Sequence, residues 1–222
     1  MADANGTSPL DVWWDIRLAE VEKNLKQRSF AVDCVPDAAA ALKLFSDSIL
    51  PESKAASVSV GGSETVRLVG LYELLNGRKD LDFLNPFAPG ITPEERLEIR
   101  RRAQLVDVYL SSTNALMRDG RLLNLDGTGN RVAAMHFGPK KVVLFVGRNK
   151  IAEDLEGARQ RVKECAGPAN CIRLARKTPC VKTGSCMECS SPERICNVWT
   201  LTEYSSPPGR IHIVLINQDL GY

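Results

Sequence analysis

The chain has 222 residues, of which 44% are hydrophobic and 25% are charged. These proportions are typical of a folded globular domain and exclude a disordered, collagen-like or long coiled-coil protein. The formal net charge is only +2, so no overall charge attracts the chain to nucleic acid or to a membrane surface.

The N-terminus and the apolar runs predict the compartment. Residues 1–5 contain no basic stretch followed by an apolar region, so we expect no secretory signal. The most apolar runs, 142–146 and 213–216, are far shorter than the ~20 residues that a membrane helix needs. We therefore expect a cytoplasmic protein without a membrane partner, in which reduced thiols are available for metal binding or catalysis.

Helices and strands alternate through the first half of the chain. The spacing predicts an amphipathic helix over 10–28, in an N-terminal segment 1–29 that packs on the rest. A strand over 30–35 precedes a helix that Asp37 caps and that ends near residue 49. A strand over 57–60, a turn over 61–63 and a helix over 64–75 form the next unit. Thr92, Pro93 and Glu95 predict a capping box, and the helix it starts ends near residue 105.

The second half continues this pattern. The expected elements are strands over 106–110, 122–124, 142–146, 198–204 and 211–216, helices over 131–136, 149–164 and 168–176, and a turn over 126–130. Residues 178–195 contain proline, glycine and serine without periodicity, which predicts a loop. The alternation predicts one α/β domain over 30–222, built on a single open, mainly parallel sheet flanked by helices.

Seven cysteines are the unusual feature, and four of them lie within residues 178–196, here called the cysteine segment. These four are Cys180, Cys186, Cys189 and Cys196, which the sequence predicts as ligands of one metal centre. A single Cys-x2-Cys with outlying cysteines favours an iron–sulfur cluster, and zinc is the alternative. Plain thiols, with or without an incidental disulfide, are the structural alternative. Cys34, Cys165 and Cys171 are interpreted as core residues.

The charge around the cysteine segment is positive. Residues 161–196 hold seven lysines and arginines against three glutamates. Since nearby cations stabilise thiolates, this local excess agrees with a thiolate-rich site.

Loops that follow the predicted strands form a candidate ligand site. The carboxyl ends of parallel strands meet at one sheet edge, where ligands bind, and the turn over 61–63 opens a helix whose N–H groups can meet an anion. The candidate ligand-binding residues are Gly61, Gly62, Ser63, Thr65, Ser111, Asn114, Asp126, Asn130, Arg131, Gly147, Asn149 and Lys150. Turn formation explains Ser63, Asp126 and Asn130 about equally well.

Glu64 is the candidate catalytic residue, as an acid, a base or a carboxylate nucleophile activated by burial in a cleft. The alternative is that Glu64 only complements the helix dipole. The two histidines, His136 and His212, are interpreted as structural, which disfavours a histidine-based triad.

Several motifs carry a family resemblance. They are residues 61–66, 111–115, 123–134, 137–139 and 146–150, of which the block from 111 to 150 is the most specific. Together they resemble the lactate-utilisation (LUD) domain family, also called YkgG-like, and the cysteine segment resembles that of a smaller branch of it. The resemblance implies the fold of CoA transferases, ribose-5-phosphate isomerase and glucosamine-6-phosphate deaminase. Some members belong to systems that oxidise lactate to pyruvate alongside iron–sulfur proteins.

These observations predict a protein of redox or organic-acid metabolism that binds a small anionic metabolite or cofactor at the sheet edge and a four-cysteine metal centre. A redox protein is the macromolecular partner that such a function would need, and nucleic acid is not expected. One alternative is an isomerase or CoA-transferase-like enzyme that uses Glu64 and has structural cysteines. The other is a noncatalytic sensor or assembly subunit. The sequence leaves open whether the protein is an enzyme and which oligomer it forms.

Overall fold

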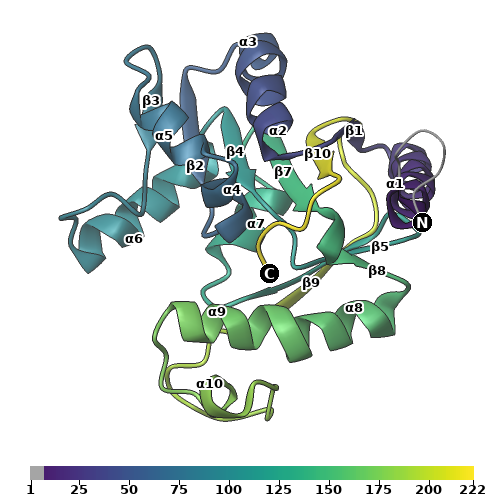
Figure 1. Cartoon of the computed structure of the whole chain (residues 1–222). Coiled ribbons are helices and arrows are strands. Elements are labelled where there is room, and N and C mark those ends of the chain that lie inside the picture. Colours follow the sequence, from purple (N-terminus) through teal and green to yellow (C-terminus); the bar gives the residue numbers. More distant parts are fainter. Residues whose placement is uncertain (1–7) are drawn as a thin grey trace.

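A six-stranded sheet forms the centre of the computed structural model, which describes residues 8–222 (Figure 1). Every strand pair in it is parallel. In spatial order the strands are β1 (Ala31–Val35), β10 (Ile211–Ile216), β7 (Lys141–Gly147), β4 (Val108–Ser111), β2 (Ser57–Val60) and β3 (Asp82–Leu84). Helices flank the sheet on both faces, which confirms the predicted α/β fold class.

A second sheet of four strands lies beside the first and was not predicted from the sequence. Its order is β8 (Ile151–Ala152), β5 (Ala115–Met117), β6 (Leu122–Asp126) and β9 (Val198–Thr202). β6 pairs antiparallel with both β5 and β9, whereas β8 pairs parallel with β5. β9 and β10, adjacent in sequence, therefore belong to different sheets.

The first helix, α1 (Pro9–Gln27), covers one face of the parallel sheet. Ser8 caps it by accepting a hydrogen bond from the backbone N–H of Asp11. Leu18, Val21 and Leu25 are buried in the same apolar cluster as residues of β7 and β10. Residues 1–7 lie outside the described residues. The start of the predicted segment 1–29, and the expectation that residues 1–5 contain no secretory signal, therefore concern residues that are not described.

The opposite face is covered by α2 (Ala38–Leu44), which continues through a π-helical turn into α3 (Leu50–Ser53), and by α4 (Glu64–Leu68) and α5 (Leu71–Asn76). Asp37 caps α2 as predicted. The predicted single helix over 64–75 is wrong, because Gly70 adopts φ +87° and separates α4 from α5. A left-handed residue cannot continue a right-handed helix.

The helix α6 (Pro93–Arg102) starts at the predicted capping box. The Thr92 side chain accepts from the backbone N–H of Glu95 at 3.2 Å, and the Glu95 carboxylate accepts from the Thr92 N–H at 2.7 Å. A 3-10 turn over 103–105 follows α6. The short helix α7 (Asn130–His136) comes directly after β6.

A long helix packs against the second sheet (Figure 1). It comprises α8 (Leu155–Arg161), a π-helical turn over 162–166 and α9 (Gly167–Arg173). The predicted break between 164 and 168 is therefore wrong, and the helix begins later than residue 149 because 148–150 form a 3-10 turn that leads into β8. The cysteine segment is largely loop as predicted, with one added short helix, α10 (Cys180–Thr183). No helix within residues 8–222 has the length and apolar character that a membrane span requires.

Candidate functional site

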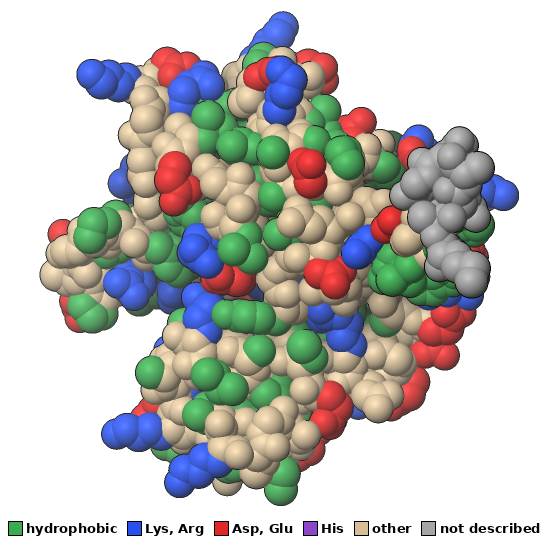
Figure 2. Space-filling view, viewed as in Figure 1, with side chains coloured by type: hydrophobic (Ala, Val, Ile, Leu, Met, Phe, Trp, Pro, Cys, Tyr) green, Lys and Arg blue, Asp and Glu red, His purple; other side chains and the backbone are tan. Residues whose placement is uncertain are grey.

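A cleft of about 310 Å³ lies where the parallel sheet meets α6 and α9. The loops after β2, β4 and β7 reach it with Ser63, Ser112 and Lys150, and the loop after β6 contributes Asp126. The structure thus brings together the three loops that the sequence analysis assigned to one sheet edge. Figure 2 shows lysine and arginine side chains along the furrow between the lower layer, built on α8 and α9, and the rest of this face.

The structure divides the candidate ligand-binding residues into two groups. Those that line the cleft, together with Glu64, are Gly62, Ser63, Asn114, Asp126, Asn130, Arg131 and Lys150. The residues that do not line it are Gly61, Thr65, Ser111, Gly147 and Asn149.

The C-terminal residues cover three members of the second group. Asn149 donates to the carbonyl of Gly221 at 3.0 Å, and its side-chain oxygen accepts from the Leu220 N–H at 3.0 Å. Thr65 donates to the Leu220 carbonyl at 3.2 Å. A Cβ on Gly147 would lie 2.7 Å from the Leu220 nitrogen, so only glycine permits this close approach. These three residues hold the 220–222 segment in place.

Gly61 and Ser111 lie beneath the cleft. Both are buried, and a Cβ on Gly61 would stand 2.8 Å from the Tyr109 hydroxyl oxygen and 2.9 Å from Ser111 Oγ. Gly61 therefore serves close packing rather than contact with a ligand.

Arg131 is the centre of a hydrogen-bond network in the cleft wall. Its Nε donates to Asp126 Oδ2 at 3.0 Å, and its Nη2 donates to Asn114 Oδ1 at 2.9 Å. Its Nη1 donates to Asn124 Oδ1 at 2.8 Å and to the Ser112 carbonyl at 3.1 Å. Since its donors already have partners, Arg131 shapes the cleft and ties the loop after β4 to β6.

Glu64 stands at the cleft with its carboxylate paired to Arg67. The Arg67 Nε donates to Glu64 Oε1 at 2.9 Å. The hydrogen bond from Arg67, and more weakly the charges of Arg67 and Arg173, lower the pKa of Glu64 against the opposing effect of burial. The arginines outweigh desolvation, so burial does not raise the pKa of Glu64. Glu64 is held as a carboxylate, which suits a nucleophile or a base and not a general acid.

Lys150 is a deeply buried cation of the cleft that has no acidic partner among residues 8–222. The side chain is 4% exposed and is positioned by the 3-10 turn after β7. Among residues 8–222 its Nζ makes one hydrogen bond, to Ser112 Oγ at 3.0 Å. Burial lowers the pKa of Lys150 to about 7, and the charges of Arg161 and Arg131 add to this effect.

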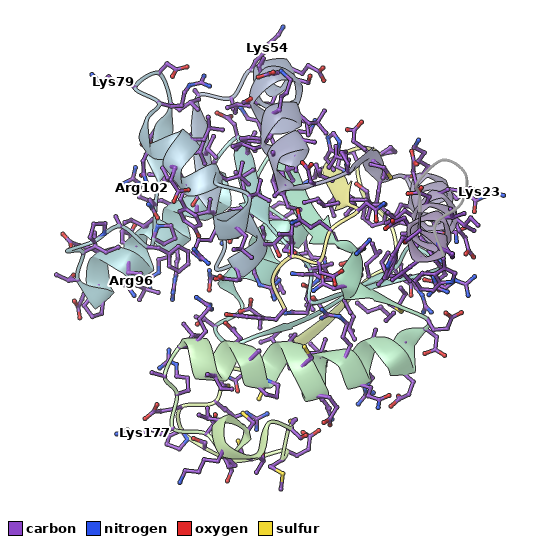
Figure 3. The ribbon with its side chains drawn as sticks, in the orientation of Figure 1. Lys23, Lys54, Lys79, Arg96, Arg102 and Lys177 are labelled. Atoms are coloured by element: carbon purple, nitrogen blue, oxygen red, sulfur yellow. The ribbon has the colours of Figure 1, made fainter. Side chains whose placement is uncertain are left out.

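Four arginines that the sequence analysis did not select also line the cleft. They are Arg96 and Arg100 on α6, Arg173 on α9 and Arg176 just beyond it. Figure 3 labels Arg96. Within the described residues none of the four forms an ion pair, whereas their neighbours Arg101 and Arg102, away from the cleft, pair with Glu98 at 3.6 Å and Asp82 at 3.8 Å. The i,i+4 spacing of Arg96 and Arg100, which places both on one helix face, was the available sequence signal.

The cysteine segment forms a second, smaller cavity of about 60 Å³ next to the cleft. Cys171, Cys180, Cys186 and Cys196 line this cavity, whereas Cys189 does not. All seven cysteines are free thiols. Within residues 8–222 no three histidine, cysteine, aspartate or glutamate side chains are arranged to hold a metal ion.

The interpretation of Cys34, Cys165 and Cys171 as core residues is only partly right. Cys34 and Cys165 are exposed rather than in the core, since Cys34 lies on the edge strand β1. Cys171 is buried, as expected, but it faces the cavity of the cysteine segment. It is the cavity residue that the spacing analysis left out.

Charges and local hydrogen bonds hold the cysteine segment. Arg194 donates to the carbonyls of Cys189 and Cys196, each at 2.8 Å, and so joins the two ends of the last loop. Burial raises the pKa of Cys186, although the nearby Lys163 opposes this. Burial also raises the pKa of Cys171 to about 11. For these two thiols desolvation exceeds the effect of the local basicity, contrary to the expectation from charge alone.

Comparisons with known proteins agree with this architecture. The sequence model of the LUD domain matches residues 18–216. A solved structure, described as a DUF162 family protein from Deinococcus radiodurans, is similar in fold with a TM-score of 0.53 and 13% sequence identity, covering 92% of this chain and 98% of its own. No curated protein matches the chain. Because the family model spans most of the sequence, the chain belongs to the LUD domain family.

Proposed function

We propose that the cleft binds a small metabolite or cofactor that carries carboxylate or phosphate groups. The observation that carries the proposal is Lys150, a buried cation with one neutral hydrogen-bond partner in the described chain. A buried charge without a counter-ion is costly, and a bound anion would remove that cost. The cleft's 310 Å³ suits a small molecule rather than a macromolecule.

The charge balance of the lining supports an anionic ligand. The lining includes six cationic side chains and two carboxylates, Glu64 and Asp126. Both carboxylates are already paired, with Arg67 and Arg131 respectively. The unpaired cations are therefore available to a ligand, and arginine guanidinium groups suit carboxylate and phosphate oxygens in particular.

Binding of simple anions tests this function. The thermal unfolding midpoint would be measured with inorganic pyrophosphate or citrate at constant ionic strength, with glycerol as a neutral control. We expect a saturable rise with the anions and none with glycerol. Arg100→Ala should weaken binding roughly tenfold, because a charge-assisted hydrogen bond is lost. Arg101→Ala, on the same helix but outside the cleft, is the matched control and should bind like the parent. Equal weakening in both variants would contradict a specific site.

We further propose that the cysteine segment holds a metal centre with Cys180, Cys186, Cys189 and Cys196 as the sequence-derived ligands. The shared cavity supports adding Cys171 to the candidate ligands. Lys163 and Arg194 stand close enough to Cys186 to lower its pKa, and they could offset the charge of bound thiolates. The all-sulfur donor set fits either iron–sulfur or zinc chemistry.

The sequence spacing, one Cys-x2-Cys with outlying cysteines, favours an iron–sulfur cluster over a single zinc ion. A cluster of several iron and sulfide ions occupies more space and would supply one-electron transfer. Ala166, Asn170 and Ile195 line both the cleft and the cysteine cavity, so a centre there would share a wall with the bound metabolite.

Metal analysis of anaerobically purified protein tests the centre. We expect brown protein that contains iron and sulfide, and serine substitution at Cys180 or Cys186 should lower the iron content. Cys34→Ser is the control, since Cys34 lies on the far edge strand. Zinc alone would convert the proposal into a structural zinc site, and protein with neither metal would overturn it.

Carboxylate chemistry at Glu64 is the second candidate function, as in an isomerase or CoA-transferase-like enzyme. The lowered pKa of Glu64 and its place at the cleft favour it as a nucleophile. A covalent adduct at Glu64 after incubation with an acyl-CoA would support this candidate. Anion binding without any turnover would instead favour a sensor or assembly subunit.

A further inference from the structure

We infer that Lys150 is an amine nucleophile, and that it forms an imine with a small aldehyde or ketone whose carboxylate or phosphate group is bound by the cleft arginines. The inference rests on the proposed anion-binding function. It goes further by naming the reacting atom, Lys150 Nζ, and the second functional group that the ligand must carry, a carbonyl.

The position of Lys150 supports this role. Its side chain lines the cleft although it is almost fully buried, so its Nζ is reached from the cleft and not from the outer surface. The amine has the Ser112 hydroxyl at 3.0 Å and no carboxylate within ion-pair distance among residues 8–222. A structural lysine at this depth would be paired, because an isolated buried ammonium is unfavourable.

The neighbours of Lys150 lower the proton affinity of its amine. Arg161 is anchored by donating to the carbonyls of Asn149 and Asn114, so its charge remains near Lys150, and within residues 8–222 no carboxylate pairs with it. Arg131 adds a second fixed positive charge. Burial next to other cations is a recognised way to make a lysine nucleophilic. The unprotonated, nucleophilic form of the amine is therefore accessible at neutral pH.

The chemical step balances without an added reagent. The amine nitrogen attacks the carbonyl carbon and a C–N bond forms. The carbonyl oxygen leaves as water, and both hydrogens of that water come from the attacking amine nitrogen, which is left as a neutral imine. Ser112 Oγ is placed to pass a proton between nitrogen and oxygen. Nothing is oxidised or reduced.

The arginines select the anionic part of the ligand. Arg96 and Arg100 on α6 and Arg173 on α9 line the same cleft from two elements, so a carboxylate or phosphate between them would leave the carbonyl free to meet Lys150. Glyoxylate carries a carboxylate directly on its aldehyde carbon, and glyceraldehyde 3-phosphate carries a phosphate on the second carbon beyond its aldehyde. Comparing them shows which group the cleft prefers.

Reductive trapping tests the inference. The protein is incubated with glyoxylate or glyceraldehyde 3-phosphate and cyanoborohydride at pH 7, and the modified lysines are mapped by peptide mass spectrometry. We expect Lys150 to be modified at least tenfold more than Lys177, an exposed lysine labelled in Figure 3. Pyrophosphate should protect Lys150. Lys150→Met should lose the adduct, and Lys177→Met should keep it. Because the mapping uses the parent protein, the result holds even if Lys150→Met folds poorly.

The outcomes separate this inference from the proposed function. Even modification of all lysines, or an unmodified Lys150, overturns the imine. If pyrophosphate still raises the unfolding midpoint in that case, the anion-binding function stands and only the imine falls. If Lys150 is not selectively modified and pyrophosphate does not raise the unfolding midpoint, both the imine and the anion-binding function are overturned.

Discussion

The cleft and the cysteine segment share a wall but are held together in different ways. In the cleft wall, the Arg131 guanidinium alone makes five hydrogen bonds to oxygen atoms of β6 and of the loop after β4. The cysteine segment has one four-residue helix, and Arg194 joins its last loop through two backbone carbonyls. The cleft is therefore preorganised without a ligand, whereas the cysteine segment is held by local turns and by hydrogen bonds to Lys163 and Lys177, and a metal would add cross-links between its loops.

The largest effect should come from breaking the cleft network. Arg131→Ala leaves the buried Asp126 carboxylate without its cation, and we expect the free energy of unfolding to fall by about 3–5 kcal/mol. Equilibrium unfolding in urea measures this loss. Arg101→Ala removes only an exposed pair and should cost about 0.5 kcal/mol or less. A loss below about 1 kcal/mol for Arg131→Ala would show that the network does not stabilise the cleft.

Removal of a bound metal should loosen the cysteine segment and leave the cleft unchanged. If a centre is bound at a metal activity a hundredfold above its dissociation constant, chelation should speed proteolysis within the cysteine segment roughly a hundredfold. Gly184 and Glu188, both at positive φ, mark the loop tips where cleavage is expected. Urea unfolding of the sheet should change little. Equal proteolysis with and without chelator would show that no metal orders this segment.

The sequence predicted the parts of the fold that carry strong local signals. The strands β7 and β10 are continuous apolar runs, and the capping box of Thr92 and Glu95 is a local motif. The second sheet was missed because β5 has three residues and β8 has two, which is too short for any alternation to register. The break at Gly70 was missed because one glycine within an apolar helix pattern is often tolerated.

The site was predictable only where residues follow strand ends. Lys150 and Asn114 were found because they follow β7 and β4. Arg96 and Arg173 reach the cleft from helices that are far apart in sequence, and only the packing of α6 and α9 brings them together. Cys171 was missed for the same reason, since it joins the thiol cavity from α9 rather than from the cysteine segment.

A smaller effect should appear in the pH dependence of the cleft. Lys150 has a pKa of about 7 in the free protein, and a bound anion favours its charged form and so raises that pKa. Anion affinity should therefore fall about tenfold between pH 6 and pH 8. Trapping of glyoxylate should change in the opposite direction, because the unprotonated amine is the nucleophile. Calorimetric titration with pyrophosphate measures the first trend, and Lys150→Arg should flatten it.

The lowered pKa of Lys150 also determines whether the free energy of unfolding rises or falls with pH. Its folded pKa of about 7 lies below the ordinary value of 10.5, so the unfolded chain binds more protons between these values. The free energy of unfolding should rise with pH across that window, and less so in Lys150→Met. The assigned direction would be contradicted if the free energy of unfolding of the parent protein falls across this window and Lys150→Met removes that fall.

The smallest effect should come from Glu64→Gln. Its partner Arg67 is largely exposed, so losing the ion pair should change the free energy of unfolding by less than about 1 kcal/mol. The change also removes a negative charge from the cleft lining, and we expect pyrophosphate to bind roughly twofold to threefold more tightly. Calorimetric titration of both proteins measures the difference, with Glu98→Gln, outside the cleft, as the control. Weaker binding in Glu64→Gln would mean that the carboxylate orders Arg67 or the α4 N-terminus for the ligand, which would make this end of the cleft as preorganised as the Arg131 wall.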